Sequence, residues 1–377
     1  MVWVAHNFGF LGGSLGCAEG EKITRAFEFA RERLLPVCVQ CRSGGARMQE
    51  GTSSLMQMAK VSVAVEALRR EAIPFIAVLS DPTYGGVSAS YAMQADVKIA
   101  VEDARIGFAG PQVILNTMCD ADQHIFDSKC PPDFQSASYV HAYGQIDVVL
   151  SGDECRQDYI EKYVEGICGT LVQGLKGADK EAVQSADSSL GEVPDSDKNS
   201  PFDYTNSRKI DRPQAQDVIH ALFNDFVELS GDSRVGRDVC LRGGIAKFEG
   251  LSCVVLGTFK GHTPQLMQNA NYGMASPHGY RTALRLMRLA EQFNMPVVTL
   301  VDTVGAWPTF ECERDGQSEA IASNLTAMAG LKVPIVTLIL GEGGSGGALG
   351  IGMGNVIGML SGAYFGVISP EGAAVCR

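Results

Sequence analysis

Apolar runs that contain a proline recur at the same spacing in two parts of this chain. The runs "LPVCVQ" and "IPFIAVLS" carry Pro36 and Pro74, and the runs "MPVVTLVD" and "VPIVTLIL" carry Pro296 and Pro334, with 38 residues between the prolines of each pair. Each run leads into a glycine-rich turn, and the segments between the runs suit helices. The pattern predicts strand, glycine turn and helix in the same order twice, which indicates two homologous α/β domains.

The same match extends upstream of both pairs. Gly20 leads into "EKITRAFEFARERLLP" and Gly279 leads into "YRTALRLMRLAEQFNMP". Both segments have apolar residues at helical spacing and basic residues on the opposite face. We therefore expect an amphipathic helix before the first proline of each half.

A polar segment separates the two halves. Between about Gly177 and Asp211 the chain is rich in Ser, Asp and Pro and has no strand or helix periodicity over most of its length. Such composition is typical of a linker. We expect a domain at 1–176, a linker at 177–211 and a second domain at 212–377.

Composition and charge narrow the class of protein. The 377 residues are 45% hydrophobic and 20% charged, which suits a soluble protein with two cores. The formal net charge of -12 disfavours a nucleic-acid partner, which would need clustered Lys and Arg. The start "MVWVAHNFGFLGG" does not resemble a secretory signal, and no apolar run has the length of a membrane span. These features predict a cytoplasmic protein.

The cysteines predict no metal site. Eleven of them are scattered through apolar segments, as expected for reduced thiols. Cys38 and Cys41 have the C-x-x-C spacing of a zinc or redox site. On a strand, however, residues three apart point to opposite faces, so the two thiols could not readily share one metal.

The stretch "GEGGSGGALG" raises two interpretations. Gly341, Gly343 and Gly346 fit the G-x-G-x-x-G spacing of a dinucleotide site. That fingerprint belongs in the first strand-turn-helix unit of a domain, and the counterpart "DPTYGGVSAS" in the first half does not fit it. Main-chain N–H groups at a helix start can instead stabilise a developing oxyanion. Two related halves would then supply two oxyanion holes.

Longer motifs give a specific resemblance. Residues 8–150, with "FGFLGGSLGCAEGEKI", "SGGARMQEG" and "LSDPTYGGVSASYAM", resemble the bacterial acetyl-CoA carboxylase carboxyltransferase β subunit. Residues 212–374, with "RPQAQDVIHALFNDFVELSGD", "GQSEAIASNL" and "GEGGSGGALGIG", resemble its α subunit. The resemblance implies two crotonase-like domains built from repeated ββα units.

It also implies a reaction and its partners. The family transfers a carboxyl group from carboxybiotin, carried on a separate protein, to acetyl-CoA and so forms malonyl-CoA for fatty acid synthesis. By that resemblance the biotin carboxyl carrier protein and biotin carboxylase would be other chains, the protein would be at least a homodimer, and no side-chain base would be needed.

Site residues follow from the resemblance position by position. Gly44, Gly45, Gly85 and Gly86 would form the thioester oxyanion hole, and Gly346, Gly347 and Ala348, with Gly305 and Ala306, would form the biotin-side hole. Arg47 is the candidate for orienting a substrate carboxylate, since a guanidinium suits that group. The alternative for Arg47 is a salt bridge to Glu50 or another nearby carboxylate. Glu342 and Glu371 are expected to cap or pair locally.

The chain also departs from the family pattern. No cysteine-rich zinc ribbon precedes the first half, and the sequence stops at "SPEGAAVCR", where the α subunit would continue; a fragment and a reduced variant would both explain this. Val304, Trp307 and Thr309 stand in "DTVGAWPT" where the family has Pro, Tyr and Gly, and "ERDGQ" at 313–317 replaces "EERGQ". The loop 261–273 contains no Lys or Arg where the family is basic.

These differences keep other functions open. Carboxyl transfer to another acyl thioester or malonyl-thioester decarboxylation would use the same thioester hole. A non-catalytic scaffold subunit would fit the altered 304–317 region. A dinucleotide-binding module is the remaining alternative.

Overall fold

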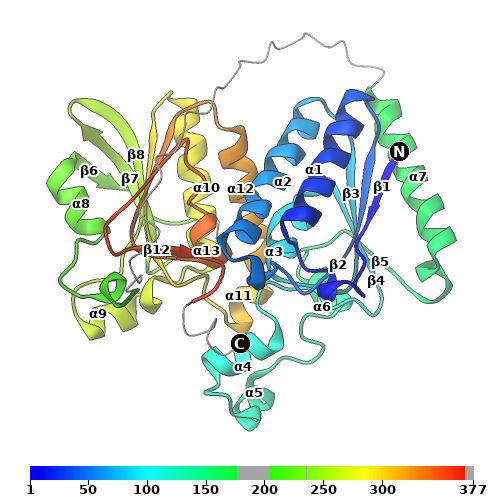
Figure 1. Cartoon of the computed structure of the whole chain (residues 1–377), viewed down its shortest axis with the longest axis horizontal. Coiled ribbons are helices and arrows are strands. Elements are labelled where there is room, and N and C mark those ends of the chain that lie inside the picture. The colour runs from blue at the N-terminus through cyan, green and yellow to red at the C-terminus, as the bar shows by residue number, and fades with distance from the viewer. Residues whose placement is uncertain (176–203, 235, 370–377) are drawn as a thin grey trace.

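The computed structural model describes residues 1–175, 204–234 and 236–369 and contains two β-sheets flanked by helices (Figure 1). In the N-terminal half, five strands pair in sequence order and all neighbours are parallel. The strands are β1 (Val2–Ala5), β2 (Val37–Ser43), β3 (Phe75–Thr83), β4 (Val97–Val101) and β5 (Val148–Leu150). Parallel strands need crossover connections, and the helices supply them.

Helices connect these strands and cover the sheet. The long ones are α1 (Cys17–Glu32), α2 (Thr52–Arg70) and α7 (Gln157–Leu175). Shorter segments are η1 (Leu11–Gly13), η2 (Met48–Glu50), α3 (Gly85–Val87), η3 (Ser88–Ala92), α4 (Pro111–Met118), α5 (Gln123–Lys129), α6 (Ala137–Ala142) and η4 (Gly152–Cys155). Ile23, Phe27 and Ala30 form the buried stripe of α1, as helical spacing requires.

The C-terminal half has a mixed sheet. Its strands are β6 (Asn224–Glu228), β7 (Leu241–Phe248), β8 (Leu251–Thr258), β9 (Val297–Thr303), β10 (Ile335–Gly344), β11 (Val356–Met359) and β12 (Tyr364–Gly366). The order is β11-β10-β9-β8-β7-β6, and β12 also pairs with β10. β8 to β12 pair in parallel, whereas β7 pairs antiparallel with both β6 and β8.

The helices of this half repeat the N-terminal plan around the central strands. They are η5 (Tyr204–Arg208), α8 (Ala215–Leu222), α9 (Pro264–Asn269), η6 (Asn271–Gly273), α10 (Pro277–Gln292), α11 (Phe310–Arg314), α12 (Gln317–Gly330) and α13 (Ser345–Leu349). α10 starts with Pro277, a position where the missing N–H has no intrahelical partner to lose.

The internal repeat seen in the sequence is present in the backbone. Val37 lies opposite Phe75, and Val297 lies opposite Ile335, so the 38-residue spacing is the register of β2 against β3 and of β9 against β10. Equivalent positions of the two halves are 260 residues apart: Leu15 pairs with Ala46 in an isolated bridge, and Ala275 pairs with Ala306 in another.

The same offset corrects the expected helix starts. α1 and α10 span 16 residues each and begin at Cys17 and Pro277, so both start before Gly20 and Gly279, and those two glycines are not equivalent positions. Gly16 and Ser276, the residues before the helices, have extended backbones that end the preceding turn.

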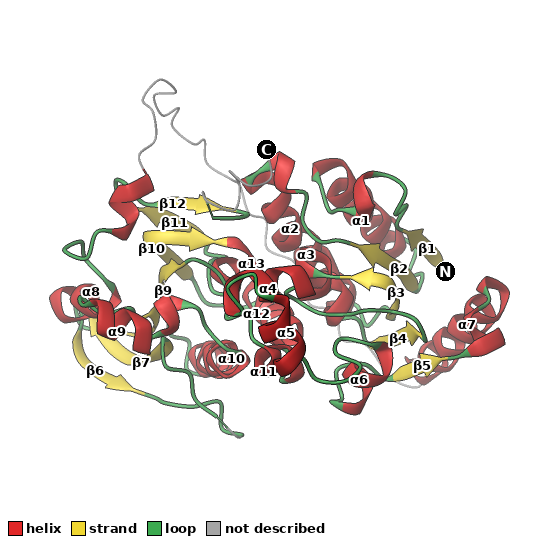
Figure 2. Cartoon of the chain, turned by 90° about the horizontal axis from the view of Figure 1, so that it is seen from below, coloured by secondary structure: helices red, strands yellow, loops and turns green. Residues whose placement is uncertain are grey.

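The two halves share one apolar core. α2 and α12 lie between the two sheets in both views (Figures 1 and 2). Buried residues of both sheets and both helices, among them Met58, Ile76, Leu325 and Ile339, form one continuous cluster. The fold is therefore α/β with largely parallel sheets, as predicted.

The end of the predicted linker is folded. Residues 204–208 form η5, and Arg208 reaches Glu342 in β10, so at least 204–211 belong to the C-terminal half rather than to a linker as predicted. Residues 176–203 lie outside the described part. Within the described residues, no helix has the length and apolar character needed to cross a membrane.

Candidate functional site

Two glycine turns meet at the ends of β2 and β3. Gly45 follows β2 with a φ of 115°, and Gly85 follows β3 with a φ of 55°; both values favour glycine. A Cβ added to Gly45 would lie 3.4 Å from the main-chain N of Gly86, and one added to Gly86 would lie 3.2 Å from the N of Ala46. The absence of side chains therefore lets the two turns lie against each other.

Most of the amides expected to form the first oxyanion hole already have acceptors. The N–H of Gly44 donates to the carbonyl of Gly12 (3.0 Å), that of Gly45 to Oγ of Ser43 (3.0 Å) and that of Gly85 to the carbonyl of Phe108 (3.2 Å). Within the described chain, no acceptor is found for the N–H groups of Ala46 and Gly86. The free pair is therefore Ala46 with Gly86, and Ala46 was not among the residues expected.

The turns after β9 and β10 repeat this arrangement. The N–H of Gly305 donates to Oγ1 of Thr303 (3.1 Å), as that of Gly45 does to Ser43. Across the described ranges, the N–H groups of Ala306, Gly346 and Gly347 have no protein acceptor. A Cβ added to Gly347 would lie 2.3 Å from the N of Ala306. This second pair of turns therefore also presents free amides at a position that only glycine allows.

The remaining glycines of "GEGGSGGALG" serve packing. Gly341, Gly343 and Gly344 lie within β10, so they form no turn of a dinucleotide fingerprint. An added Cβ would collide with the Arg212 guanidinium at Gly341 and with the Phe365 ring at Gly343, in each case at 2.4 Å. The helix itself begins at Ser345, whose φ of 56° matches the 55° of Gly85, and Ala348 is buried in that helix.

Arg47 is fully engaged by the protein. Its NH1 lies 2.8 Å from Glu50 Oε1 and 2.9 Å from Glu19 Oε2, while Nε and NH2 donate to Oγ and the carbonyl of Ser14. Its side chain is 6% exposed. The structure therefore favours the salt-bridge alternative over a role in orienting a substrate.

A buried charged cluster lies beside the second pair of turns. Lys260 Nζ is 2.8 Å from Glu342 Oε2 and 3.0 Å from Asp302 Oδ1. Arg212 pairs with Asp302, and Arg208 Nε is 2.7 Å from Glu342 Oε1. Glu342 is therefore ion-paired, but with residues distant in the sequence and not with the local partners expected, and Glu371 lies outside the described residues. Among the described residues, the cluster joins the cations of Arg208, Arg212 and Lys260 to the carboxylates of Asp302 and Glu342.

This cluster lines a cavity of about 300 Å³. The opposite wall is mainly uncharged and includes Met267, Tyr272, Met274 and Val304. The loop 261–273 contributes Met267 and Tyr272, so the cations of this cavity come from outside that loop. Sequence reasoning missed the cluster because its members are far apart along the chain.

Hydrogen bonds within the altered segment 304–317 and to the N-terminal half hold this segment in place. Thr309 caps α11, because its hydroxyl accepts the N–H of Cys312 at 3.2 Å. Glu313 is 5% exposed and accepts the N–H groups of Phe108 (2.8 Å) and Ala109 (2.6 Å). Burial raises the pKa of Glu313 to about 7 despite these two amides.

The candidate thiol pair is buried in β2. Cys38 and Cys41 are both inaccessible, and burial raises the pKa of each thiol. The described cysteines are free thiols, and the described residues contain no group of three or more His, Cys, Asp or Glu arranged to hold a metal.

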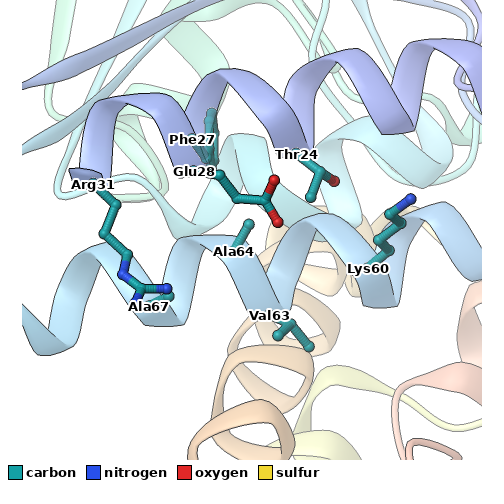
Figure 3. Close-up of a pocket in the computed structure, with 8 residues that line it drawn as sticks. All are labelled: Thr24, Phe27, Glu28, Arg31, Lys60, Val63, Ala64 and Ala67. Atoms are coloured by element: carbon teal, nitrogen blue, oxygen red, sulfur yellow. The ribbon is translucent and has the colours of Figure 1, made fainter. Parts of the chain in front are cut away.

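A separate groove of about 320 Å³ lies between α1 and α2 (Figure 3). Phe27, Val63 and Ala64 form its apolar part, and Glu28, Arg31 and Lys60 also line it. None of the expected site residues contributes to this groove, so we do not assign it to the site.

The two pairs of turns thus present, at two separate places, main-chain amides that have no acceptor among the described residues. Residues 200–376 match the family model described as "Acetyl co-enzyme A carboxylase carboxyltransferase-like". Proteins named acetyl-coenzyme A carboxylase carboxyl transferase subunits beta/alpha are similar over nearly the whole chain. That of Salinispora tropica is 44% identical over 98% of this chain and 63% of its own length, and that of Saccharopolyspora erythraea is 42% identical over 99% and 63%.

The similarity extends to a separate α subunit. The acetyl-coenzyme A carboxylase carboxyl transferase subunit alpha of Francisella tularensis subsp. novicida is 52% identical over 45% of this chain and 53% of its own length. This chain is thus similar to acetyl-coenzyme A carboxylase carboxyltransferases along nearly its whole length, and it spans less than two thirds of the length of the fused relatives. Among solved structures, transcarboxylase 12S with hydrolysed methylmalonyl-coenzyme A aligns over 98% of this chain and 67% of its own, at 23% identity and a TM-score of 0.38.

Proposed function

We propose that this chain is the carboxyltransferase component of a biotin-dependent acetyl-CoA carboxylase. It would transfer a carboxyl group from carboxybiotin on a carrier protein to acetyl-CoA and form malonyl-CoA. The free amides of Ala46 and Gly86 in one half, and of Ala306 and Gly346 in the other, are the observation that carries the proposal. The 44% identity to the fused carboxyl transferase of Salinispora tropica supports it.

The N-terminal turns would bind the acyl thioester. Loss of a proton from the acetyl methyl group places negative charge on the thioester oxygen. Ala46 and Gly86 would each donate an N–H to that oxygen, and fixed donors of this kind each lower a barrier by about 3 to 4 kcal/mol. The proton would pass to the ureido nitrogen of biotin that is freed when the carboxyl group leaves, so no side chain near these turns need act as the base.

The C-terminal turns would bind biotin. The amides of Ala306, Gly346 and Gly347 are free, and glycine at 346 and 347 keeps side chains away from them. These amides fit a small carbonyl-type oxygen such as that of the ureido group. Carboxybiotin would supply the carboxyl group there. The amides would stabilise negative charge on the ureido oxygen, and the ion-paired cations of Arg208, Arg212 and Lys260 lie beside them.

We also propose the architecture and setting that go with this function. The two halves would be crotonase-like domains, the first on the acyl-CoA side and the second on the biotin side. The biotin carrier and biotin carboxylase would be separate partners in the cytoplasm, and the protein would assemble at least as a homodimer.

The reverse reaction tests the proposal. The full reading frame that contains this chain is incubated with malonyl-CoA, with and without biocytin, and acetyl-CoA is measured. We expect acetyl-CoA formation that depends on biocytin. Acetyl-CoA formed equally well without biocytin would identify a decarboxylase, and binding of malonyl-CoA without turnover would identify a scaffold.

A further inference from the structure

Glu313 connects the two halves of the molecule through one buried carboxylate. It lies in α11 of the C-terminal half, yet both of its oxygens accept main-chain N–H groups of the N-terminal half, at Phe108 and Ala109. The connection is reinforced by Gln145, whose side-chain amide donates to the carbonyls of Glu313 (3.0 Å) and Arg314 (3.1 Å).

The segment held by Glu313 contacts both candidate holes. The carbonyl of Phe108 accepts the N–H of Gly85, next to the free amide of Gly86. The Phe108 ring lies against Gly346, where an added Cβ would be 3.4 Å from the ring edge. Phe108 therefore touches the thioester-side turn through its main chain and the biotin-side turn through its side chain.

Other contacts show that residues 107–109 pack closely around the Glu313 carboxylate. A Cβ added to Gly107 would lie 2.8 Å from Glu313 Oε2 and 2.2 Å from Nε2 of Gln135. Gln135 donates to the carbonyl of Ala109 at 2.8 Å, and Ser88 donates to the carbonyl of Gly107 at 2.6 Å. Glycine at 107 thus leaves the space that the carboxylate occupies.

We propose that Glu313 is a positioning residue that holds Phe108, and through it the two pairs of turns, at a fixed separation for carboxyl transfer. This inference rests on the proposed function. Glu313 touches neither substrate, so its effect passes through the loop 107–109. The ionised carboxylate can accept both N–H groups, whereas a carboxamide presents an N–H₂ to one of them and loses that bond.

The ionisation of Glu313 gives a distinguishing readout. Its pKa is about 7, so the ionised fraction rises from about one tenth at pH 6 to about nine tenths at pH 8. The titratable groups that interact with it are Tyr84, Tyr139 and Cys312, whose pKa values burial raises to about 12. Arg314 and Asp315 lie beside it and form an ion pair with each other at 2.8 Å.

The experiment uses the full reading frame and measures kcat and KM for the biocytin-dependent reaction from pH 6 to 8. In the wild type we expect kcat to rise through pH 7. Glu313→Gln should lower kcat about tenfold or more at pH 8, leave KM for malonyl-CoA within about twofold, and remove the rise near pH 7. Glu311→Gln, at an exposed position of the same helix, is the matched control and should behave as wild type.

A second variant separates positioning from loss of folding. Phe108→Leu keeps the main-chain bonds to Glu313 and removes the ring contact with Gly346, so it should lower kcat while the rise near pH 7 stays. Circular dichroism and the melting temperature report folding of each variant. A Glu313→Gln protein with wild-type kcat, or with the rise near pH 7 unchanged, would overturn the inference. Inactivity of the wild type would instead refute the proposed function.

Discussion

The residues that distinguish this site are those whose main-chain amides have no acceptor in the described part of the chain. Gly44, Gly45 and Gly85 have the conformations of the turn but donate to other described residues, whereas Ala46 and Gly86 do not. An amide that is already bonded would have to break that bond before it could stabilise a substrate oxygen. The donors are therefore set by tertiary contacts, and glycine content alone does not identify them.

Gly347 tests the biotin-side turn at the residue scale. In Gly347→Ala the new Cβ would lie 2.3 Å from the N of Ala306, so the turn must move and its amides lose their alignment. We expect kcat for the biocytin-dependent reaction to fall about 10²- to 10³-fold. Gly110→Ala is the control, because a Cβ at Gly110 meets nothing within 4 Å and its φ is -61°. Equal activity of the two variants would contradict the assignment.

Arg47 is expected to affect stability rather than substrate binding. Arg47→Met leaves Glu19 and Glu50 without their shared partner in a largely buried position. We expect the free energy of unfolding in urea to fall by about 3 kcal/mol. Arg25→Met, which removes an exposed pair with Glu21, should leave it almost unchanged. A rise in KM for malonyl-CoA with unchanged stability would restore the substrate role.

The sequence identified the turns, but it did not show which main-chain N–H groups are hydrogen-bonded to other parts of the protein. Glycine spacing and the repeat placed Gly86, Gly346 and Gly347 correctly at helix starts. The acceptors of the other amides, such as the carbonyls of Gly12 and Phe108, come from segments that only the fold brings near. The repeat itself points to Ala46, since Ala46 and Ala306 occupy equivalent positions in the two halves.

At the scale of elements, ion pairs connect the ends of β8, β9 and β10. Lys260 follows β8, Asp302 lies in β9 and Glu342 lies in β10, all three nearly inaccessible. The equivalent positions of Asp302 and Glu342 in the first half are Arg42 and Pro82, so the first half has no such network. The two sheets therefore share a backbone plan and differ in the charge at their strand ends.

Removal of Lys260 should weaken this part of the sheet. Lys260→Met leaves two buried carboxylates with fewer partners, and breaking a buried pair costs about 3 to 5 kcal/mol. Lys247→Met removes the ion pair between the exposed side chains of Lys247 and Asp225 in the same half and should leave stability almost unchanged. Urea unfolding of both variants measures the difference, and similar losses would show that the cluster adds no special stability.

The strands that repeat were predicted better than those that do not. Apolar runs that open at a proline predicted β2, β3, β9 and β10, because buried parallel strands are continuously apolar; their register is a finding of the structure. The antiparallel β6 and β7 were missed. The burial pattern of β6 is mostly exposed, and Gly243 and Gly244 weaken the signal of β7.

At the scale of the whole molecule, the halves are held together by more than the chain that joins them. Besides the shared core, Gln94 donates to the carbonyl of Ala322 at 3.1 Å, and Ser318 donates to Ser88 at 3.0 Å, both in buried surroundings. Breaking the contact would expose apolar surface and leave these polar groups unpaired.

A cut between the halves should therefore leave them associated. A protease site inserted within residues 180–200, and then cleaved, should give two fragments that elute together in size-exclusion chromatography. We expect thermal unfolding in a single transition within a few degrees of the uncut protein. The uncut protein carrying the same insertion is the control, and elution of separate folded halves would contradict a shared core.

The offset of 260 residues lets equivalent positions of the two halves be compared within one molecule. Gly86 and Gly346 have the same place in the same turn, and each faces Met58. A Cβ at Gly86 would also lie 3.2 Å from the main-chain N of Ala46, whereas one at Gly346 would meet only side-chain atoms, at 3.4 Å or more. The same turn therefore tolerates an added methyl group less well in the first half than in the second.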